Sequence, residues 1–426
     1  MLRLIKKAYH VLRAQGPRKV AQLTAQKIGH TVKIRLSYPL KYLQPISEID
    51  PFDPASLPRP RLQRAGTSSL SLRWYMPAPS RGSGGHLNLF RIIEELARRG
   101  HRSEVAILDG PTSGQSREKW RAFNRSHFRS DAEVVWDSDP QRDVDLVLAT
   151  TWISAYTAVR DTACAARAYV VQDWEPDFYA RGTESILAEN SYRLGFHHIT
   201  AGPWLADRLR AAGATASPFP FAADPDIYYP VPAEHEPGKV HVVFYARPVT
   251  PRRCYELGLE ALRLLNQRLG RDRLVVSFAG WPIAPFPAEF AIRRRGILPL
   301  EELRTLYSSA DVVLVLSATN PSLLPLEVAL CGVPVVDLKL DSVQGTIRDG
   351  VSARLAPPSP PAIAAAIAQL VAHPDEARAL AERARQYALS CTWEATAIAV
   401  EAGLLEALEQ QGQREIRLPL PLPGAG

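Results

Sequence analysis

Apolar residues alternate between two spacings over the first half of the chain. Short apolar runs, typical of buried strands, fall at residues 70–76, 104–108, 144–149, 168–172 and 198–201. Apolar residues at helical spacing lie between them, at 86–99, 153–160 and 203–212. Gly100 follows the first of these helices, as expected of a helix C-terminus. Strands that alternate with helices predict a parallel sheet covered by helices on both faces.

A second series with the same alternation follows the proline-rich segment 218–239. It predicts strands at 240–246, 274–279, 311–317 and 334–337, and helices at 255–269, 300–310, 324–331 and within 361–409. The chain therefore has an α/β fold class with two tandem Rossmann-like, doubly wound domains. Ligands of such sheets bind at the carboxyl ends of the strands, so we expect the site in an interdomain cleft.

Composition and length fit this organisation and suggest its boundaries. The chain has 426 residues, 46% hydrophobic and 22% charged, which suits two or three globular domains and excludes a disordered protein. We place a basic helical arm and proline-rich linker at 1–64, the first domain at 65–222, the second at 223–395, and a C-terminal helix and tail at 396–426. No apolar run reaches the roughly 18 residues of a membrane span. Four cysteines without metal or redox spacing favour the cytoplasm.

The net charge of +7 comes from the N-terminal arm. Residues 1–41 contain ten Lys and Arg and no acidic residue, and the rest of the chain carries −3. Leu2, Ile5, Tyr9 and Leu12 give part of the arm an amphipathic spacing. Two interpretations stay equal: attachment to an anionic membrane surface, on the inner face, or a helix packed on the protein's own body. A transit peptide is a third. We predict no nucleic-acid binding, because no aromatic platform or known module accompanies the charge.

A glycine-rich turn at 80–86 joins the first strand to its helix. Gly84 and Gly85 would let the backbone approach a ligand, and the helix start offers free N–H groups to an anion. A purely structural turn is equally compatible. The turn lacks the full spacing of a nicotinamide site. His86, at the start of the helix, could reach the cleft, although a histidine there is commonly structural.

Two arginines open the second domain. Arg247 follows a predicted strand end, and Arg252 is expected to begin the next helix. Guanidinium groups suit a phosphate or diphosphate, which they bind through paired N–H donors. The alternative is a solvated basic helix start, which the helix dipole disfavours. We therefore favour the anionic ligand.

The loop before residues 324–331 gives the sharpest signal. The N–H groups of Ser322, Leu323 and Leu324 could hold a phosphate, and Glu327 could accept hydrogen bonds from ribose hydroxyls. Alternatively, Glu327 is only a partner of the helix dipole. Spacing alone leaves both interpretations open.

Three stretches resemble a known enzyme family: YARPVTPRRCYELGLEAL, NPSLLPLEVALCGVPVV and VQDWEPDFY. They look like retaining nucleotide-sugar glycosyltransferases of family four, which have the GT-B fold, and most like bacterial rhamnosyltransferases of rhamnan and surface-layer glycan assembly. The resemblance covers residues 70–410. It also implies that the last helix, which begins near Thr392, crosses back to the first domain.

The resemblance implies roles for the donor-side residues. Arg247 and Arg252 would bind the donor diphosphate, although the family usually has lysine at the second position. Glu327 would contact the nucleotide ribose, and Gly84 and Gly85 would approach the donor phosphates. Thr319 stands where the family has a glutamate, so one carboxylate of the motif is absent.

On the acceptor side, the resemblance makes Asp173 a sugar or acceptor contact, with Gln172 replacing a common histidine. Three residues that follow at the same strand end, Trp174, Glu175 and Tyr179, could stack on a sugar ring, with core packing as an equal alternative. The acidic pairs at 137–139 and 224–226 imitate metal sites but lie in turns, where aspartates usually cap the backbone. We expect no metal and no cofactor.

The resulting hypothesis is a metal-independent, retaining glycosyltransferase. It would move a hexosyl unit, by resemblance rhamnosyl from deoxythymidine-diphosphate rhamnose, from a nucleoside-diphosphate donor to a glycan or lipid-linked glycan acceptor. A nucleotide-sugar epimerase on the same scaffold and a non-catalytic nucleotide-sugar-binding component of a glycan-assembly complex remain as alternatives. A membrane-scaffold or nucleic-acid-binding role dominated by residues 1–41 is a further alternative.

Overall fold

The computed structural model describes residues 46, 49–63, 69–108, 110, 114–270 and 272–416, with side chains up to residue 412. Its contacts divide the chain into two units, Met1–Leu57 and Pro58–Gly426. The described end of the first unit is a pair of turns, in which the Phe52 N–H donates to Asp50 Oδ1 at 2.9 Å and the Ala55 N–H to Asp53 Oδ1 at 3.0 Å. The predicted basic arm at 1–41 lies outside the described residues.

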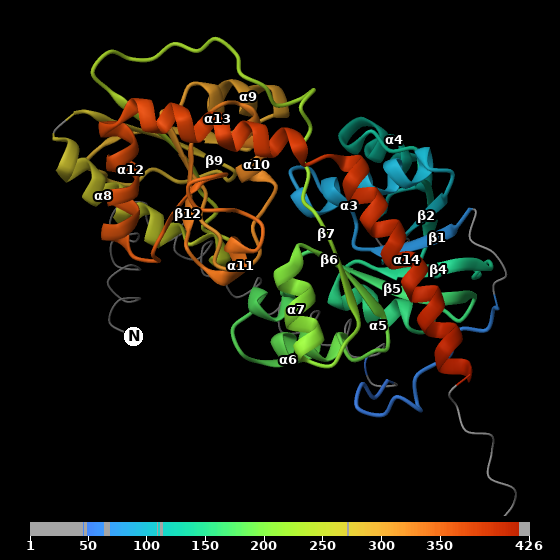
Figure 1. The fold of residues 1–426 in the computed structure, drawn as a ribbon. Coiled ribbons are helices and arrows are strands. Elements are labelled where there is room, and N and C mark those ends of the chain that lie inside the picture. The colour runs from blue at the N-terminus through green and yellow to red at the C-terminus, as the bar shows by residue number, and fades with distance from the viewer. Residues whose placement is uncertain are drawn as a thin grey trace, which may run out of the picture. The chain divides into compact units, whose positions relative to one another are not determined.

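Seven parallel strands form the first sheet of the second unit, in the order β3-β2-β1-β4-β5-β6-β7 (Figure 1). The strands are β1 Ser71–Met76, β2 Arg102–Ile107, β3 Glu133–Trp136, β4 Val144–Ala149, β5 Cys164–Val171, β6 His197–Ala201 and β7 Ala216–Phe219. The helices between them are α3 Gly84–Arg98, α4 Arg117–Phe128, α5 Trp152–Ala158, the 3₁₀ helix η2 Glu175–Phe178, α6 Thr183–Ser191 and α7 Pro203–Ala211. The five strands expected from the apolar runs are all present. The sequence prediction missed β3, β7, α4 and α6.

Six parallel strands form the second sheet, in the order β10-β9-β8-β11-β12-β13. The strands are β8 Val240–Tyr245, β9 Leu274–Ala279, β10 Ala291–Gly296, β11 Val312–Leu314, β12 Val335–Leu338 and β13 Arg354–Ala356. The helical elements are η3 Pro251–Arg253, α8 Tyr255–Leu269, α9 Leu300–Ser308, α10 Leu324–Leu330, α11 Asp341–Gln344, α12 Pro360–Ala372 and α13 Pro374–Ser390. This strand order is that of doubly wound nucleotide-binding sheets. The predicted fold class, two tandem doubly wound α/β arrangements, is confirmed.

Helix α8 packs closely on the second sheet because of Gly258. A Cβ atom at this position would lie 2.3 Å from Cζ of Phe244, so only glycine fits against the ring. Phe244 and Phe278 are fully buried there, edge to face at 5.9 Å. The close approach fixes α8 and the turn before it, where Arg252 lies.

The last helix, α14 Trp393–Ile416, packs on the first sheet, against β5, β6, β7 and α3 (Figure 1). Its Thr396 hydroxyl donates to the Pro220 carbonyl at 2.9 Å, and Glu401 pairs with Arg99 at 2.5 Å. The chain therefore returns to the first sheet after completing the second. No described helix is long and apolar enough to cross a membrane.

In each sheet, the order in which the chain adds strands reverses at the centre. The chain winds outward from β1 to one side and later fills the other side from β4, and it does the same from β8 and β11. Loops that follow such strands leave a crevice at their carboxyl ends. The loops at 77–83, 172–174, 246–254 and 315–323 follow β1, β5, β8 and β11, and they carry the candidate site.

Candidate functional site

Asp173, directly after β5, connects the two sheets. Its Oδ2 accepts a hydrogen bond from the Thr319 hydroxyl at 2.9 Å, and its Oδ1 accepts from the Asn320 N–H at 3.0 Å and the Trp174 N–H at 2.8 Å. Nε of Arg252 lies 3.2 Å from Oδ2 as an ion pair. Burial raises the pKa of Asp173, and the charge of Arg252 is the largest influence that opposes it.

Asn320 completes this connection from the loop after β11. Its Nδ2 donates to the carbonyls of Gln172 at 2.9 Å and Ala201 at 2.8 Å, at the ends of β5 and β6. It is 1% exposed, and its Oδ1 has no hydrogen-bond partner among the described residues. The sequence prediction did not single out Asn320, although its place in a polar loop after a buried strand was a usable signal.

Arg252 lies in the 3₁₀ helix η3, and α8 begins only at Tyr255. The prediction that Arg252 begins the helix was wrong, because Pro251 opens a separate turn and Cys254 adopts a left-handed φ of 47° before α8. Burial lowers the pKa of Arg252, while Asp173 opposes the shift. The guanidinium stacks 4.0 Å from the Phe178 ring. Asp173 thus already supplies an anion, so the helix-dipole argument for a bound anion does not hold here.

Arg247 follows β8 and has a different environment. Its Nη1 donates to the Tyr245 hydroxyl at 3.3 Å, and its guanidinium lies 5.6 Å from the Trp281 ring. Within the described part of the chain, Arg247 forms no ion pair, and its buried Nε has no hydrogen-bond partner. A half-buried guanidinium with so few partners keeps N–H donors for a further acceptor, and the diphosphate contact assigned to Arg247 stays a prediction.

The glycine turn belongs to the loops that follow the strands of the first sheet. Helix α3 begins at Gly84 with Ser83 as its N-cap. A Cβ atom at Gly84 would meet nothing within 4 Å, whereas one at Gly85 would lie 3.4 Å from the Gln172 amide. Open space at Gly84 leaves room for a ligand beside the backbone, and the donor contact assigned to both glycines stays a prediction.

His86 is held inside this turn. One ring nitrogen contacts the Ser83 hydroxyl at 2.8 Å, and the other contacts the Pro77 carbonyl at 3.2 Å. Burial lowers the pKa of His86, so the ring is neutral near pH 7. The geometry therefore supports the structural role of His86, and its acceptor contact remains an untested prediction.

The start of α10 presents unbonded polar groups. Among the described residues, none accepts a hydrogen bond from the N–H groups of Ser322, Leu323 and Leu324, and the buried Ser322 hydroxyl also lacks a partner. Glu327 is 8% exposed, and burial raises its pKa to about 7 while a hydrogen bond from the Tyr228 hydroxyl opposes the shift. Its contact with ribose stays a prediction.

The Trp174 ring is buried and covered by neighbouring side chains. It is 6% exposed, packs 4.9 Å from the Tyr192 ring and carries the Arg208 guanidinium 4.0 Å above its own ring. A sugar cannot stack on the face that Arg208 covers. The predicted sugar stacking on Trp174 stays untested, and Trp174 lines a cavity.

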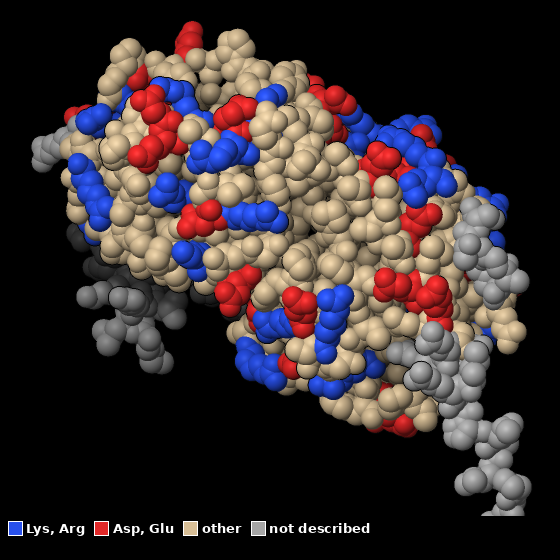
Figure 2. Space-filling model, in the orientation of Figure 1, with Lys and Arg blue, Asp and Glu red and all other residues tan. Residues whose placement is uncertain are grey.

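The acidic pairs considered for metal binding are engaged locally. Asp139 accepts from the Trp136 N–H at 2.8 Å and pairs with Arg117 at 2.5 Å, and Asp224 pairs with Arg91 at 2.8 Å. The described residues include no group of three potential metal ligands. On the face in Figure 2, Lys and Arg are interspersed with Asp and Glu.

Comparison with known proteins defines the fold class. Residues 240–368 match the family model of the WsaF C-terminal domain. The solved structure of HepE from Anabaena in complex with UDP and glucose superposes with a TM-score of 0.60 at 14% identity, over 80% of this chain and 100% of HepE. The chain has the GT-B glycosyltransferase fold. The predicted resemblance to this class is confirmed, while rhamnosyl specificity and retention stay predictions.

Two curated relatives extend the GT-B comparison. The O-antigen biosynthesis protein RfbC of Myxococcus xanthus is 32% identical over 340 residues, 78% of this chain and 27% of RfbC. A D-inositol 3-phosphate glycosyltransferase of Geodermatophilus obscurus is 28% identical over 309 residues, 67% of this chain and 66% of that protein. This GT-B chain thus spans about a quarter of the length of RfbC.

Proposed function

We propose that the protein is a glycosyltransferase that moves a hexosyl unit from a nucleoside-diphosphate donor to a glycan acceptor, with deoxythymidine-diphosphate rhamnose as the donor. The fold, the relationship to a protein named for O-antigen biosynthesis, and a neighbour solved with UDP and glucose support the proposal. The sugar and the retaining course rest on the sequence resemblance.

The observation that carries the proposal is the state of Arg247. A guanidinium removed from water is costly unless it is paired, and Arg247 has one long hydrogen bond and no carboxylate among the described residues. It lies at the carboxyl end of the central strand, where doubly wound sheets bind nucleotides. A diphosphate would provide the missing acceptors in the paired geometry that guanidinium groups favour.

The two arginines would act on the leaving group. As the bond between the anomeric carbon and the diphosphate oxygen breaks, negative charge grows on the diphosphate. Arg247 and Arg252 would donate to it, and groups placed before the reaction stabilise such charge without reorganisation. Asp173 holds Arg252 in position through the ion pair at 3.2 Å. We further propose that transfer needs no divalent cation.

One observation favours a second candidate. Thr319 provides no carboxylate, and its hydroxyl is committed to Asp173. A chain that binds the nucleotide sugar without transferring it would fit this loss. The non-catalytic binding component therefore remains the rival that an assay must separate.

A transfer assay tests the proposal. The protein is incubated with deoxythymidine-diphosphate rhamnose or UDP-glucose, with and without a glycan acceptor and with a metal chelator. We expect rhamnose transfer that requires the acceptor and persists in chelator, and NMR of the product gives the anomeric configuration. Donor binding without turnover would establish the non-catalytic rival. Conversion of the donor without an acceptor would indicate an epimerase.

A further inference from the structure

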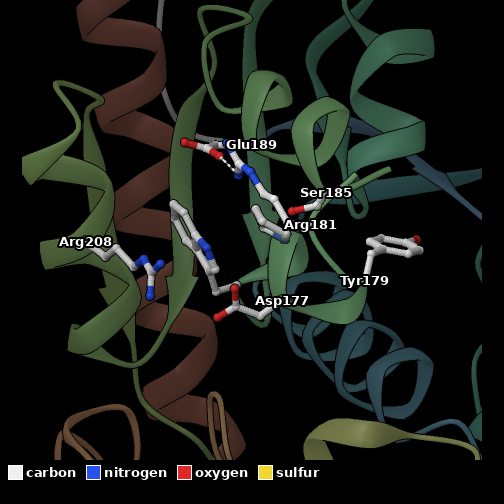
Figure 3. Close-up of a pocket in the computed structure, with 8 residues that line it drawn as sticks. Asp177, Tyr179, Arg181, Ser185, Glu189 and Arg208 are labelled. Atoms are coloured by element: carbon white, nitrogen blue, oxygen red, sulfur yellow. Dashed lines mark hydrogen bonds and ion pairs between the residues drawn. The ribbon is translucent and has the colours of Figure 1, made fainter. Parts of the chain in front are cut away.

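A cavity of about 340 Å³ opens in the first sheet's half of the molecule (Figure 3). Its walls come from the segment after β5 and from helices α6 and α7. The residues that the argument uses are Trp174, Asp177, Tyr179, Ser185 and Arg208. The volume falls at the lower end of the roughly 300–1,000 Å³ typical of small-molecule sites.

The wall formed by η2 is rigid. Glu175, 5% exposed, accepts from the Trp152 N–H at 2.8 Å and from the Tyr169 hydroxyl at 2.5 Å. The Trp152 ring N–H donates to the Tyr179 hydroxyl at 3.0 Å. These bonds orient Tyr179 before any ligand arrives, and such preorganisation lowers the entropic cost of binding.

The charges of the cavity balance. Arg181 pairs with Glu189 at 2.7 Å, as Figure 3 shows, and Arg208 and Asp177 remain as one cation and one anion. Neither Arg208 nor Asp177 forms an ion pair with another described residue. A lining of both signs without excess favours a neutral ligand over an anion. Such a lining offers both donors and acceptors, which hydroxyl groups can use together.

Two further features suit a sugar ring. The Tyr179 side chain is 36% exposed and provides an aromatic surface at the cavity wall. Ser185 is 4% exposed and places a hydroxyl in the lining. Aromatic rings combined with a few fixed polar groups are typical of sites that orient a small ligand. The predominance of polar side chains fits a ligand rich in hydroxyl groups.

The cavity adjoins the proposed donor site through a single segment. Phe178, between Asp177 and Tyr179, stacks under the Arg252 guanidinium at 4.0 Å. Consecutive residues of η2 therefore face Arg252 and the cavity.

We propose that this cavity binds a neutral sugar residue of the acceptor glycan. Saccharide binding follows from the cavity alone, and its acceptor role rests on the proposed glycosyltransferase function. Asp177 accepts from sugar hydroxyls, Arg208 and Ser185 donate to sugar oxygens, and Tyr179 contacts the ring face.

Saturation-transfer NMR on the full chain tests the proposal with the methyl glycosides of rhamnose, glucose and glucuronic acid. We expect rhamnoside or glucoside binding that Asp177→Ala and Tyr179→Ala each weaken at least tenfold. Ile186→Ala is the control, because Ile186 is 45% exposed on α6 and does not line the cavity. Calorimetry with deoxythymidine diphosphate should give the same affinity for all four proteins.

Three results would overturn the proposal: no binding by any glycoside, binding that ignores both substitutions, or displacement of the sugar by inorganic phosphate. The test separates this proposal from the proposed function. Sugar binding in the cavity without nucleotide binding would refute the glycosyltransferase and leave the saccharide site standing. Nucleotide binding without sugar binding would refute the saccharide site and leave the proposed glycosyltransferase function standing.

Discussion

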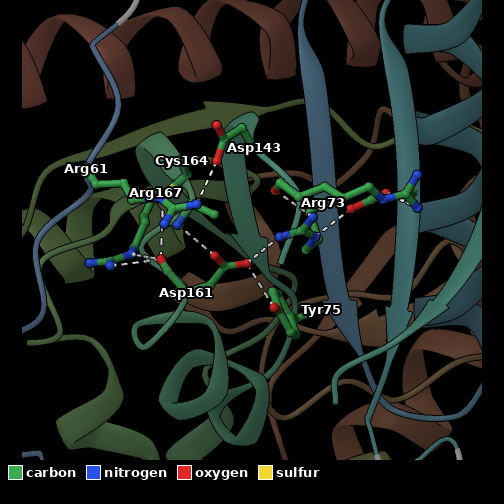
Figure 4. Close-up of polar contacts among 10 residues, drawn as sticks. Arg61, Arg73, Tyr75, Asp143, Asp161, Cys164 and Arg167 are labelled. Carbon is green, nitrogen blue, oxygen red and sulfur yellow. Dashed lines mark hydrogen bonds and ion pairs between the residues drawn. The ribbon is translucent and has the colours of Figure 1, made fainter. Parts of the chain in front are cut away.

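Two arginine sites in this protein differ in burial and in how completely their guanidinium groups are paired. In the first sheet, Arg73 is 4% exposed, and each of its three guanidinium nitrogens has a partner (Figure 4). Its Nε pairs with Glu104 at 2.5 Å, Nη1 with Asp161 at 2.7 Å, and Nη2 donates to the Arg142 carbonyl at 2.8 Å. Asp161 also accepts from the Tyr75 hydroxyl at 2.9 Å. This group is complete without a ligand.

Arg247 and Arg252 are half-buried and less completely paired. Within the described part of the chain, the Arg247 side chain has one hydrogen bond, of 3.3 Å, and Arg252 has an ion pair of 3.2 Å with Asp173 but no hydrogen bond at Nε. Native proteins leave few buried polar groups unpaired. The difference fits a structural role for Arg73, whereas Arg247 and Arg252 keep N–H donors for the diphosphate contact that we propose.

The largest expected effect comes from breaking the complete group. Asp161→Asn removes the negative charge that pairs with Arg73, and breaking a buried pair typically costs about 3–5 kcal/mol of unfolding free energy. Urea unfolding measures the loss. The control Asp143→Asn removes the exposed pair with Arg61 at 2.8 Å and should cost about 0–1 kcal/mol. Equal losses of unfolding free energy in the two variants would contradict the claim that the buried pair stabilises the fold more than the exposed pair.

A smaller effect, on the pH dependence of stability, is expected for a buried carboxyl that has no paired cation. Asp161 pairs with Arg73, whereas no described Lys or Arg pairs with Glu327, which accepts a hydrogen bond from the Tyr228 hydroxyl. Burial raises the pKa of Glu327 to about 7. The native carboxyl therefore binds its proton more tightly than the unfolded one, near 4.5. As the pH rises from about 4.5 through 7, deprotonation of Glu327 therefore lowers the unfolding free energy of the protein, by up to about 3 kcal/mol.

The variant Glu327→Gln has no proton to lose. The unfolding free energy of the variant minus that of the native protein should therefore be larger at pH 8 than at pH 5. Urea unfolding of both proteins at the two pH values measures this difference. Glu376→Gln, in the exposed first turn of α13, is the control for removing a negative charge. A difference between variant and native protein that is the same at both pH values would show that Glu327 is ordinarily ionised.

The sequence predicted the strands with continuous apolar runs and missed those without them. β10, Ala291–Gly296, contains three arginines and lies at a sheet edge, and β7 contains Pro218. Helix α4 is mostly polar, with only a few buried residues. Edge elements bury little surface, so hydrophobic periodicity carries little information about them.

The site was predictable only where it depends on chain order. Asp173, Arg247 and Arg252 each follow a strand of a parallel sheet, so their places at the carboxyl edges could be inferred. The ion pair between Asp173 and Arg252, and the bridge through Asn320, depend on how the two sheets meet. No local pattern encodes that geometry.

The measurement that tests the central claim most directly is calorimetry of deoxythymidine diphosphate and thymidine with the native protein and Arg247→Ala. If Arg247 is kept for the diphosphate, the variant should bind the diphosphate about 30-fold more weakly, about 2 kcal/mol, and thymidine as before. Arg378→Ala, which removes an exposed arginine paired with Asp375, should change neither affinity. Unchanged affinity of Arg247→Ala for the diphosphate would contradict the account.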